Sequence, residues 1–133
     1  MERNSVTEWI PYERRVGHPA DFRVRYRFYA QEEGGRRTLP YQGYRADFAY
    51  AADERLILYM IHPEFEDEHG QVIGREEHVP ACGTALVWIV IPERRQDIHR
   101  HRIHTGTRGY MMEGPHRTAE VEVIEILGLF TNS

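Results

Sequence analysis

Four histidines offer the clearest chemistry for a metal ion in this chain. His99, His101 and His104 lie within DIHRHRIHTG, and His116 precedes the last apolar stretch. On a strand, side chains at i and i+2 point the same way, so His99 and His101 would face one divalent metal. Three neutral imidazoles would leave zinc an open position for an activated water. The pattern gives one hypothesis, a small metal-dependent enzyme.

The surroundings of these histidines favour a different interpretation. His104 has the opposite strand parity unless the strand bulges or ends, and the intervening Arg100 and Arg102 repel a cation. No Asp or Glu stands at a spacing typical of a known metal motif. The alternative is a solvated histidine-rich loop or a pH-sensitive patch. We therefore expect no cofactor, with a divalent metal at the four histidines as the competing possibility.

The residue types exclude several other chemistries. All 17 positively charged residues are arginine, so neither a Schiff-base lysine nor a phosphate-loop lysine exists. The only serines are Ser5 and Ser133, which excludes a serine hydrolase. The acidic residues at 64–70 lack the alternating order of a calcium loop. The formal net charge of −4 argues against a general nucleic-acid-binding surface.

The single cysteine and the lack of a long apolar run indicate in which compartment the protein resides. The lone Cys82 cannot form an intrachain disulfide, and we expect it to be a small buried hydrophobic residue. No apolar run approaches the length of a membrane span, and the N-terminus lacks the apolar stretch of a secretory signal. A cytoplasmic protein that does not bind a membrane is the expectation.

Alternating apolar residues predict the strands that must position these side chains. From Phe22 to Ala30 every second residue is apolar, and the opposite face carries Arg23, Arg25 and Arg27. Gly34 and Gly35 are expected to supply the positive φ angles of a hairpin into the next strand. Further strands are predicted over 43–50, 55–62, 84–91, 108–112 and 118–127.

The strand over 55–62 and the segment after it carry more detailed expectations. The strand over 55–62 is apolar at nearly all its central positions, so we expect both faces to be buried and Pro63 to end it. Residues 64–78 are expected to form a hairpin excursion or long surface loop around Gly70. No segment of a dozen residues has an apolar period of 3.6. About six or seven strands predict an all-β antiparallel barrel or sandwich.

One stretch resembles a known family. YAQEEGGRRTLPYQGYRADFAY, residues 29–50, is similar to the start of the C-terminal β-barrel domain of elongation factor Tu. The matching positions are an acidic pair, Gly-Gly-Arg, a Thr, an aromatic residue, Gly-Tyr-Arg and a final aromatic residue: Glu32, Glu33, Gly34, Gly35, Arg36, Thr38, Tyr41, Gly43, Tyr44, Arg45 and Phe48. Weaker similarity continues over 79–92 and 108–118. The resemblance covers about 22–127 and implies a six-stranded Greek-key barrel.

The resemblance also implies the domain organisation. We expect residues 1–20 to form an arm docked on the barrel by Trp9, Ile10 and Tyr12, and 21–133 to form a single β-barrel domain. Residues near 64–78 and 93–106 are insertions relative to the family. A GTPase domain and its phosphate loop are absent from this sequence, so we expect no GTP binding.

The family's barrel contacts the T stem of aminoacyl-tRNA, which assigns a role to several arginines here. The resemblance implies backbone contacts by Arg36 and Arg37, with Arg117 before the last strand as a third position. Tyr44 and Arg45, in the same matching stretch, complete the expected RNA or partner-binding residues. These five positions form the predicted binding set.

Departures from the family favour a protein partner over RNA. Glu120 and Glu122 replace a Gly-Ala-Gly run that lies close to the tRNA in the family, and carboxylates repel phosphate. The family's barrel also places the first and last strands together, so these glutamates are available to Arg23, Arg25 and Arg27 as cross-strand partners. We expect a non-catalytic, translation-related binding module for a protein partner, with tRNA or structured RNA as the alternative ligand.

Overall fold

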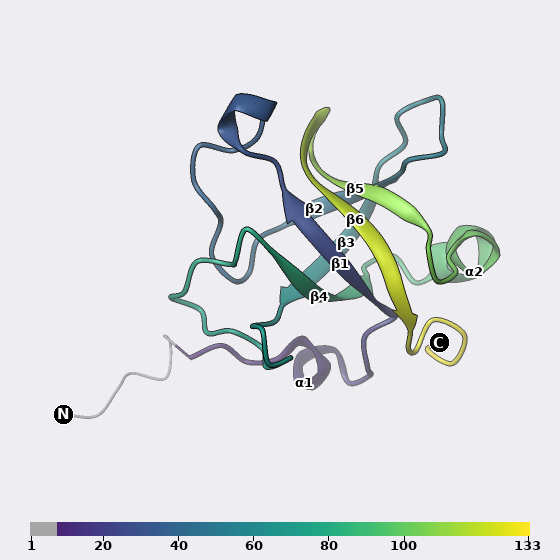
Figure 1. Ribbon diagram of the computed structural model, residues 1–133. Coiled ribbons are helices and arrows are strands. Elements are labelled where there is room, and N and C mark those ends of the chain that lie inside the picture. Colours follow the sequence, from purple (N-terminus) through teal and green to yellow (C-terminus); the bar gives the residue numbers. More distant parts are fainter. Residues whose placement is uncertain (1–7) are drawn as a thin grey trace.

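Six antiparallel strands close into a barrel in the computed structural model, which describes residues 8–133 (Figure 1). The strands are β1 (Phe22–Phe28), β2 (Ala46–Tyr50), β3 (Tyr59–Phe65), β4 (Cys82–Ile89), β5 (Arg108–Glu113) and β6 (His116–Ile126). Their spatial order is β1-β4-β3-β2-β5-β6, and β6 returns to pair with β1. Since β2, β3 and β4 are consecutive and β1 lies beside β4, the arrangement is a Greek key. The all-β barrel prediction is confirmed.

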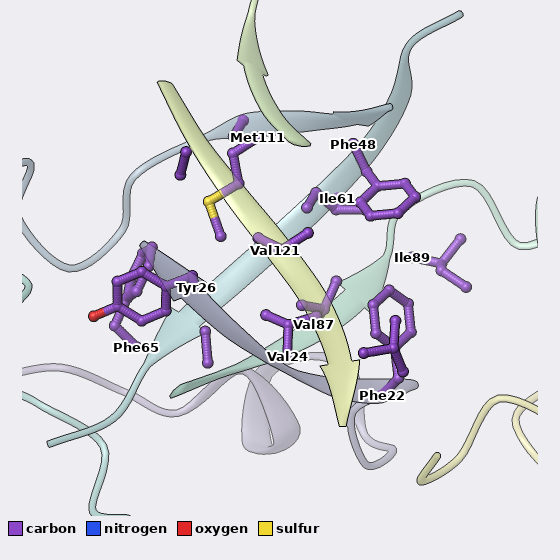
Figure 2. Packing of buried hydrophobic residues seen from close by; sticks show 14 of the residues in the cluster. Phe22, Val24, Tyr26, Phe48, Ile61, Phe65, Val87, Ile89, Met111 and Val121 are labelled. Carbon is purple, nitrogen blue, oxygen red and sulfur yellow. The ribbon is translucent and has the colours of Figure 1, made fainter. Parts of the chain in front are cut away.

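The alternating pattern of β1 builds the barrel interior. Phe22, Val24 and Tyr26 are each 1% exposed, whereas Arg25 and Arg27, which alternate with them along the strand, are exposed. Figure 2 shows these apolar side chains gathered inside the barrel with residues from the other strands. The Tyr26 ring meets the ring of Phe65 edge-on at 5.0 Å. The face of β1 predicted to be buried is the face that lines the core.

The hairpin predicted at Gly34 and Gly35 is wrong, because β1 and β2 are not neighbours. A 3-10 helix (Gln31–Glu33) follows β1, and Gly34 ends it with a φ of +94°. Gly35 does not have a positive φ; it lies so close to the preceding chain that a Cβ there would be 2.0 Å from the carbonyl oxygen of Tyr29. The two glycines start a long crossing to β2.

The strand predicted over 55–62 is displaced. β3 begins at Tyr59, and Leu56, Ile57 and Leu58 are exposed rather than buried. β3 also continues through Pro63, which pairs with Val87 of β4. Its pairing with β2 ends at Ile61, so the missing N–H of Pro63 faces a side where no strand bond is lost.

The charged segment before β5 is helical. Arg95–His99 forms a π-helical turn that continues into the short helix α2 (Arg100–Arg102). Its buried residues are Arg95, His99 and Ile103, which are spaced four apart. The expectation that His99 and His101 share the face of a strand is therefore wrong, since positions i and i+2 of a helix point in different directions.

Residues preceding β1 pack on the outside of the barrel. Helix α1 (Tyr12–Val16) lies beside β3 and β4, and Tyr12 stacks on His62 at 5.1 Å. The buried carboxylate of Glu64 accepts hydrogen bonds from Trp9 Nε1 (2.7 Å) and the Tyr12 backbone N–H (2.9 Å). Ile10 is exposed, so only two of the three residues expected to dock the arm do so. Residues 1–7 of that predicted arm lie outside the described residues.

The two predicted insertions take different forms. The first turns back on itself around Gly70, where the backbone N–H of Asp67 donates to the carbonyl of Gln71 (2.7 Å) and Glu66 bridges to Val72. The second is the helical segment before β5. No helix within residues 8–133 is long and apolar enough to cross a membrane.

Candidate functional site

A ladder of ion pairs covers the outer face of β1. Arg25 bonds to Glu122 at 3.0 Å, and Arg27 bonds to Glu120 at 3.2 Å across the β1–β6 pair. Arg27 also contacts Glu33 at 3.0 Å, and the two glutamates together raise the pKa of Arg27. The predicted cross-strand pairing is confirmed for Arg25 and Arg27, whereas Arg23 pairs with Glu66 and Glu125 instead.

Two residues of the predicted binding set are held by the same carboxylate. Arg36 donates through Nη1 to Glu113 (2.5 Å) and through Nε to the carbonyl of Thr38 (3.0 Å). The Tyr44 hydroxyl donates to the same Glu113 oxygen (2.6 Å). Burial raises the pKa of Glu113, but the bonds from Tyr44 and Arg36 outweigh it and leave that pKa below its usual value. Glu113 is therefore an ionised partner for both residues.

The other three residues of the predicted binding set form no hydrogen bond to Glu113 within residues 8–133. The Arg117 guanidinium lies over the Tyr110 ring at 3.9 Å on the outer face of β5 and β6. Arg37 and Arg45 are exposed, and neither has an ion-pair partner within residues 8–133. Arg45 lines a hollow that also includes Met60 and His62. The structure brings Arg36 and Tyr44 together on Glu113, whereas Arg45 lines a hollow that includes Glu113 without bonding to it.

His99 is a buried, neutral residue. Its side chain is 1% exposed, Nδ1 lies 2.6 Å from the Tyr50 hydroxyl, and the Tyr59 ring meets it edge-on at 4.8 Å. Burial lowers the pKa of His99 to about 4. Its Nε2 has no hydrogen-bond partner in the described part of the chain. His99 packs the end of the barrel and does not face solvent.

The remaining histidines of the predicted metal site are separated. His101 and His104 are exposed before β5, whereas His116 starts β6 beyond the other end of β5. His104 Nδ1 donates to the carbonyl of Thr105 (2.9 Å). Among residues 8–133, no three His, Cys, Asp or Glu side chains form a group that could hold a metal ion. The geometry therefore provides no site that unites the four histidines.

Cys82 is exposed, so the expectation of a buried residue is wrong. It occupies the first position of β4 opposite Arg27, where the side chain points away from the core. Its neighbours on the surface include Arg25 and Thr84. An apolar strand predicts burial only for alternate positions, and Cys82 has the parity of the outer face.

An exposed apolar surface lies beside the start of β3. It consists of Leu56 (55% exposed), Ile57 (45%), Leu58 (38%), Met60 (53%) and Ile91 (38%), and we call these five residues the apolar patch. Met60 is on the outer face of β3, and its carbonyl accepts a hydrogen bond from Val90, which precedes Ile91 (3.2 Å). Sequence reasoning missed this surface because a continuous apolar run looks the same in a core strand and in an exposed segment.

Two arginines border the apolar patch without a carboxylate partner. Arg55 directly precedes Leu56, and Arg45 lines the same hollow as Met60. Neither forms an ion pair within residues 8–133, whereas the arginines of β1 all do. Asp47, the residue paired with Met60 across β2 and β3, supplies a nearby negative charge. Glu113 lines the same hollow, so the patch has an apolar centre and a border of mixed charge in which Arg45 and Arg55 form no ion pair within residues 8–133.

Comparisons with known proteins do not assign this barrel to a family. The sequence matches no protein-family model, and no curated protein matches it at a significant level.

Proposed function

We propose that this protein is a non-catalytic binding module whose partner is another protein, held at the apolar patch. The observation that carries the proposal is the exposure of five large apolar side chains on one part of the barrel wall. Contiguous exposed apolar surface is uncommon on soluble proteins and marks interaction sites. A partner would desolvate the side chains of the apolar patch, and this burial would drive association.

The charges around the apolar patch indicate the chemistry of the partner. Arg45 and Arg55 form no ion pair within residues 8–133, although Asp47 and Glu113 line the same hollow as Arg45. Charged rims steer association and select partners of complementary sign. We infer a partner surface with an apolar centre and an acidic border, which is also a poor match for a second copy that presents the same arginines.

Two observations favour a protein over RNA. Glu113 engages Arg36, the first of the arginines to which the resemblance gives an RNA contact. Phosphate would have to compete with that carboxylate and would meet Glu120 and Glu122 on the neighbouring strand. The likeness to the elongation factor Tu barrel stays a prediction. It makes a translation-related partner part of this proposal, although a shared fold alone does not fix a partner.

The hypothesis of a metal-dependent enzyme lacks supporting geometry, because the histidines do not converge among the described residues. Metal analysis of the purified protein and titration with zinc would test it directly. Stoichiometric zinc that depends on His101 and His104 would support the enzyme hypothesis and count against a purely binding role.

Substitutions in the apolar patch test the proposed function. Wild type, Ile57→Asp and Met60→Asp would each be used to capture partners from a lysate of the source, with identification by mass spectrometry. The identified protein would then be purified and its affinity measured by calorimetry. Because each substitution places a charge in the contact, we expect binding to weaken at least about tenfold.

Val16→Asp is the matched control, since Val16 is 43% exposed on α1 and lies outside the apolar patch. Equal affinity for wild type and both patch variants would refute the proposal. Light scattering of the wild type alone tests the competing occupant. A stable dimer that Ile57→Asp converts to a monomer would mean that a second copy covers the patch.

A further inference from the structure

A hollow at one end of the barrel has a wall of cationic and donor side chains. It lies between the turn after β2 and the segment that leads into β5, with a volume of about 590 Å³. The side chains that matter are Tyr50, His101, Arg102, His104, Thr107 and Arg108. No carboxylate is part of the wall. We propose that this hollow binds a small ligand through a phosphate group.

Arg102 gives the wall a fixed guanidinium. Asp53 accepts hydrogen bonds from both terminal nitrogens of Arg102, at 2.8 and 3.2 Å. The guanidinium also lies over the Tyr50 ring at 3.8 Å, and the Tyr50 hydroxyl contacts buried His99 at 2.6 Å. This chain of contacts orients Arg102 before a ligand arrives, and preorganised donors lose little conformational entropy on binding.

Arg108 supplies positive charge that the protein does not fully neutralise. Its side chain is 72% exposed, and its nearest carboxylate is Glu122 at 3.7 Å. Glu122 already bonds more closely to Arg25, at 3.0 Å. One carboxylate thus serves two guanidiniums, so donors of Arg108 remain for a ligand. Arginine's planar fork suits the oxygens of a phosphate.

Two exposed histidines also line the hollow. His104 donates through Nδ1 to the carbonyl of Thr105, so its Nε2 donates to an oxyanion only when the ring carries a second proton. His101 is exposed and lines the same hollow. Asp53 offsets the charge of Arg102, so the positive charge that repels a metal cation and attracts an anion comes mainly from Arg108. Two of the four histidines that suggested zinc in the sequence, His101 and His104, therefore lie where an oxyanion is the better fit.

The size of the hollow favours a small phosphate compound over a polyanion. Pockets for small molecules range from about 300 to 1,000 Å³, and this hollow falls within that range. A nucleic-acid backbone would extend onto the surface of β6, where Glu120 and Glu122 lie. The inferred ligand is a phosphate ester of the size of a mononucleotide, or inorganic phosphate itself.

Calorimetric titration at low ionic strength tests the inference, with inorganic phosphate, AMP and a short single-stranded RNA as separate probes. Wild type should bind phosphate and AMP saturably. Arg108→Gln and His104→Gln should each weaken binding about tenfold, because each removes one charged or hydrogen-bonding contact. Arg94→Gln is the matched control, since Arg94 belongs to the same segment, pairs with Asp97 and lies outside the hollow.

Three results would overturn the inference. Lack of saturable binding of both phosphate and AMP, or equal affinity in wild type and the Arg108→Gln and His104→Gln variants, would overturn it. Binding of the RNA without binding of phosphate or AMP would also overturn it. Ile57→Asp, in the apolar patch, should bind phosphate like wild type, so failure of this inference and failure of the proposed protein contact give different results.

Discussion

Replacement of Asp21 by alanine should destabilise the protein by about 3 to 5 kcal/mol, because it leaves a buried guanidinium without its counter-charge. The Asp21 side chain is fully buried, and Arg95 is 2% exposed. The carboxylate accepts hydrogen bonds from Arg95 Nε (2.6 Å) and Nη2 (3.2 Å), the Ile89 N–H (2.8 Å) and Asn132 Nδ2 (2.9 Å). Alanine would leave all four donors without this acceptor. For a domain of this size the loss corresponds to a fall in Tm of about 10 to 20 °C.

Urea unfolding of wild type and Asp21→Ala at pH 7 measures this effect. Asp97→Ala is the matched control, because Asp97 pairs with Arg94 in the same segment but both side chains are largely exposed. The control should change the free energy of unfolding by less than about 1 kcal/mol. The double variant Asp21→Ala/Arg95→Leu removes the buried charge as well as its partner, so it should be more stable than Asp21→Ala alone.

Two results would refute this reasoning. A cost below about 1 kcal/mol for Asp21→Ala would mean that water or rearrangement solvates Arg95 without penalty. A double variant less stable than Asp21→Ala would mean that Arg95 stabilises the fold through its other bonds, to the carbonyls of Ile89 and Ser133. Either result would mean that the buried Asp21–Arg95 pair is not the main contact that stabilises the helical segment against the start of β1.

Three further predictions concern single side chains. Since burial lowers the pKa of His99 to about 4, stability present above about pH 6.5 is lost as the pH falls towards 4. Between pH 7 and 4.5 wild type should lose about 2 kcal/mol more unfolding free energy than His99→Gln, and equal losses would contradict the burial argument. The exposed Cys82 should react with a thiol reagent in the native protein as fast as in urea, and protection until unfolding would disprove its exposure. A salt series of tRNA binding should give the same weak signal for wild type and for Arg36→Glu and Arg37→Glu; a salt slope reduced in either variant would restore the RNA hypothesis.

Much of the barrel could be predicted because its strands follow the rule of alternation. β1 has strict alternation, and the pairing of Arg25 and Arg27 with Glu122 and Glu120 follows once the first and last strands are neighbours. Residues 55–62 lack alternation, so their period gave no information about which side chains face the core. The exposed run at Leu56 depends on where pairing between β2 and β3 stops, which is a tertiary property.

The helical segment could not be predicted because its buried face is polar. Arg95, His99 and Ile103 have the spacing of a helix, but a search for apolar periodicity counts only Ile103. Arg95 is buried because Asp21 neutralises it, and His99 because Tyr50 bonds to it. Those partners lie far away in the sequence. The hollow beside Arg102 and Arg108 could not be predicted either, because its wall combines residues that are distant in sequence, from the turn after β2 and from this segment.

The position of β1 between β4 and β6 has a consequence for how the chain folds. Both neighbours are distant in sequence, with Phe22 paired to Val87 on one side and to Ile126 on the other. At a synthesis rate of about 5 to 20 residues per second, β1 therefore stays unpaired for several seconds until β4, its first partner strand, has been made. An unpaired apolar strand can pair with other chains and aggregate, and charges interspersed along it oppose that pairing. The alternate arginines of β1, which end as partners of glutamates, would protect the nascent chain before those glutamates have been made.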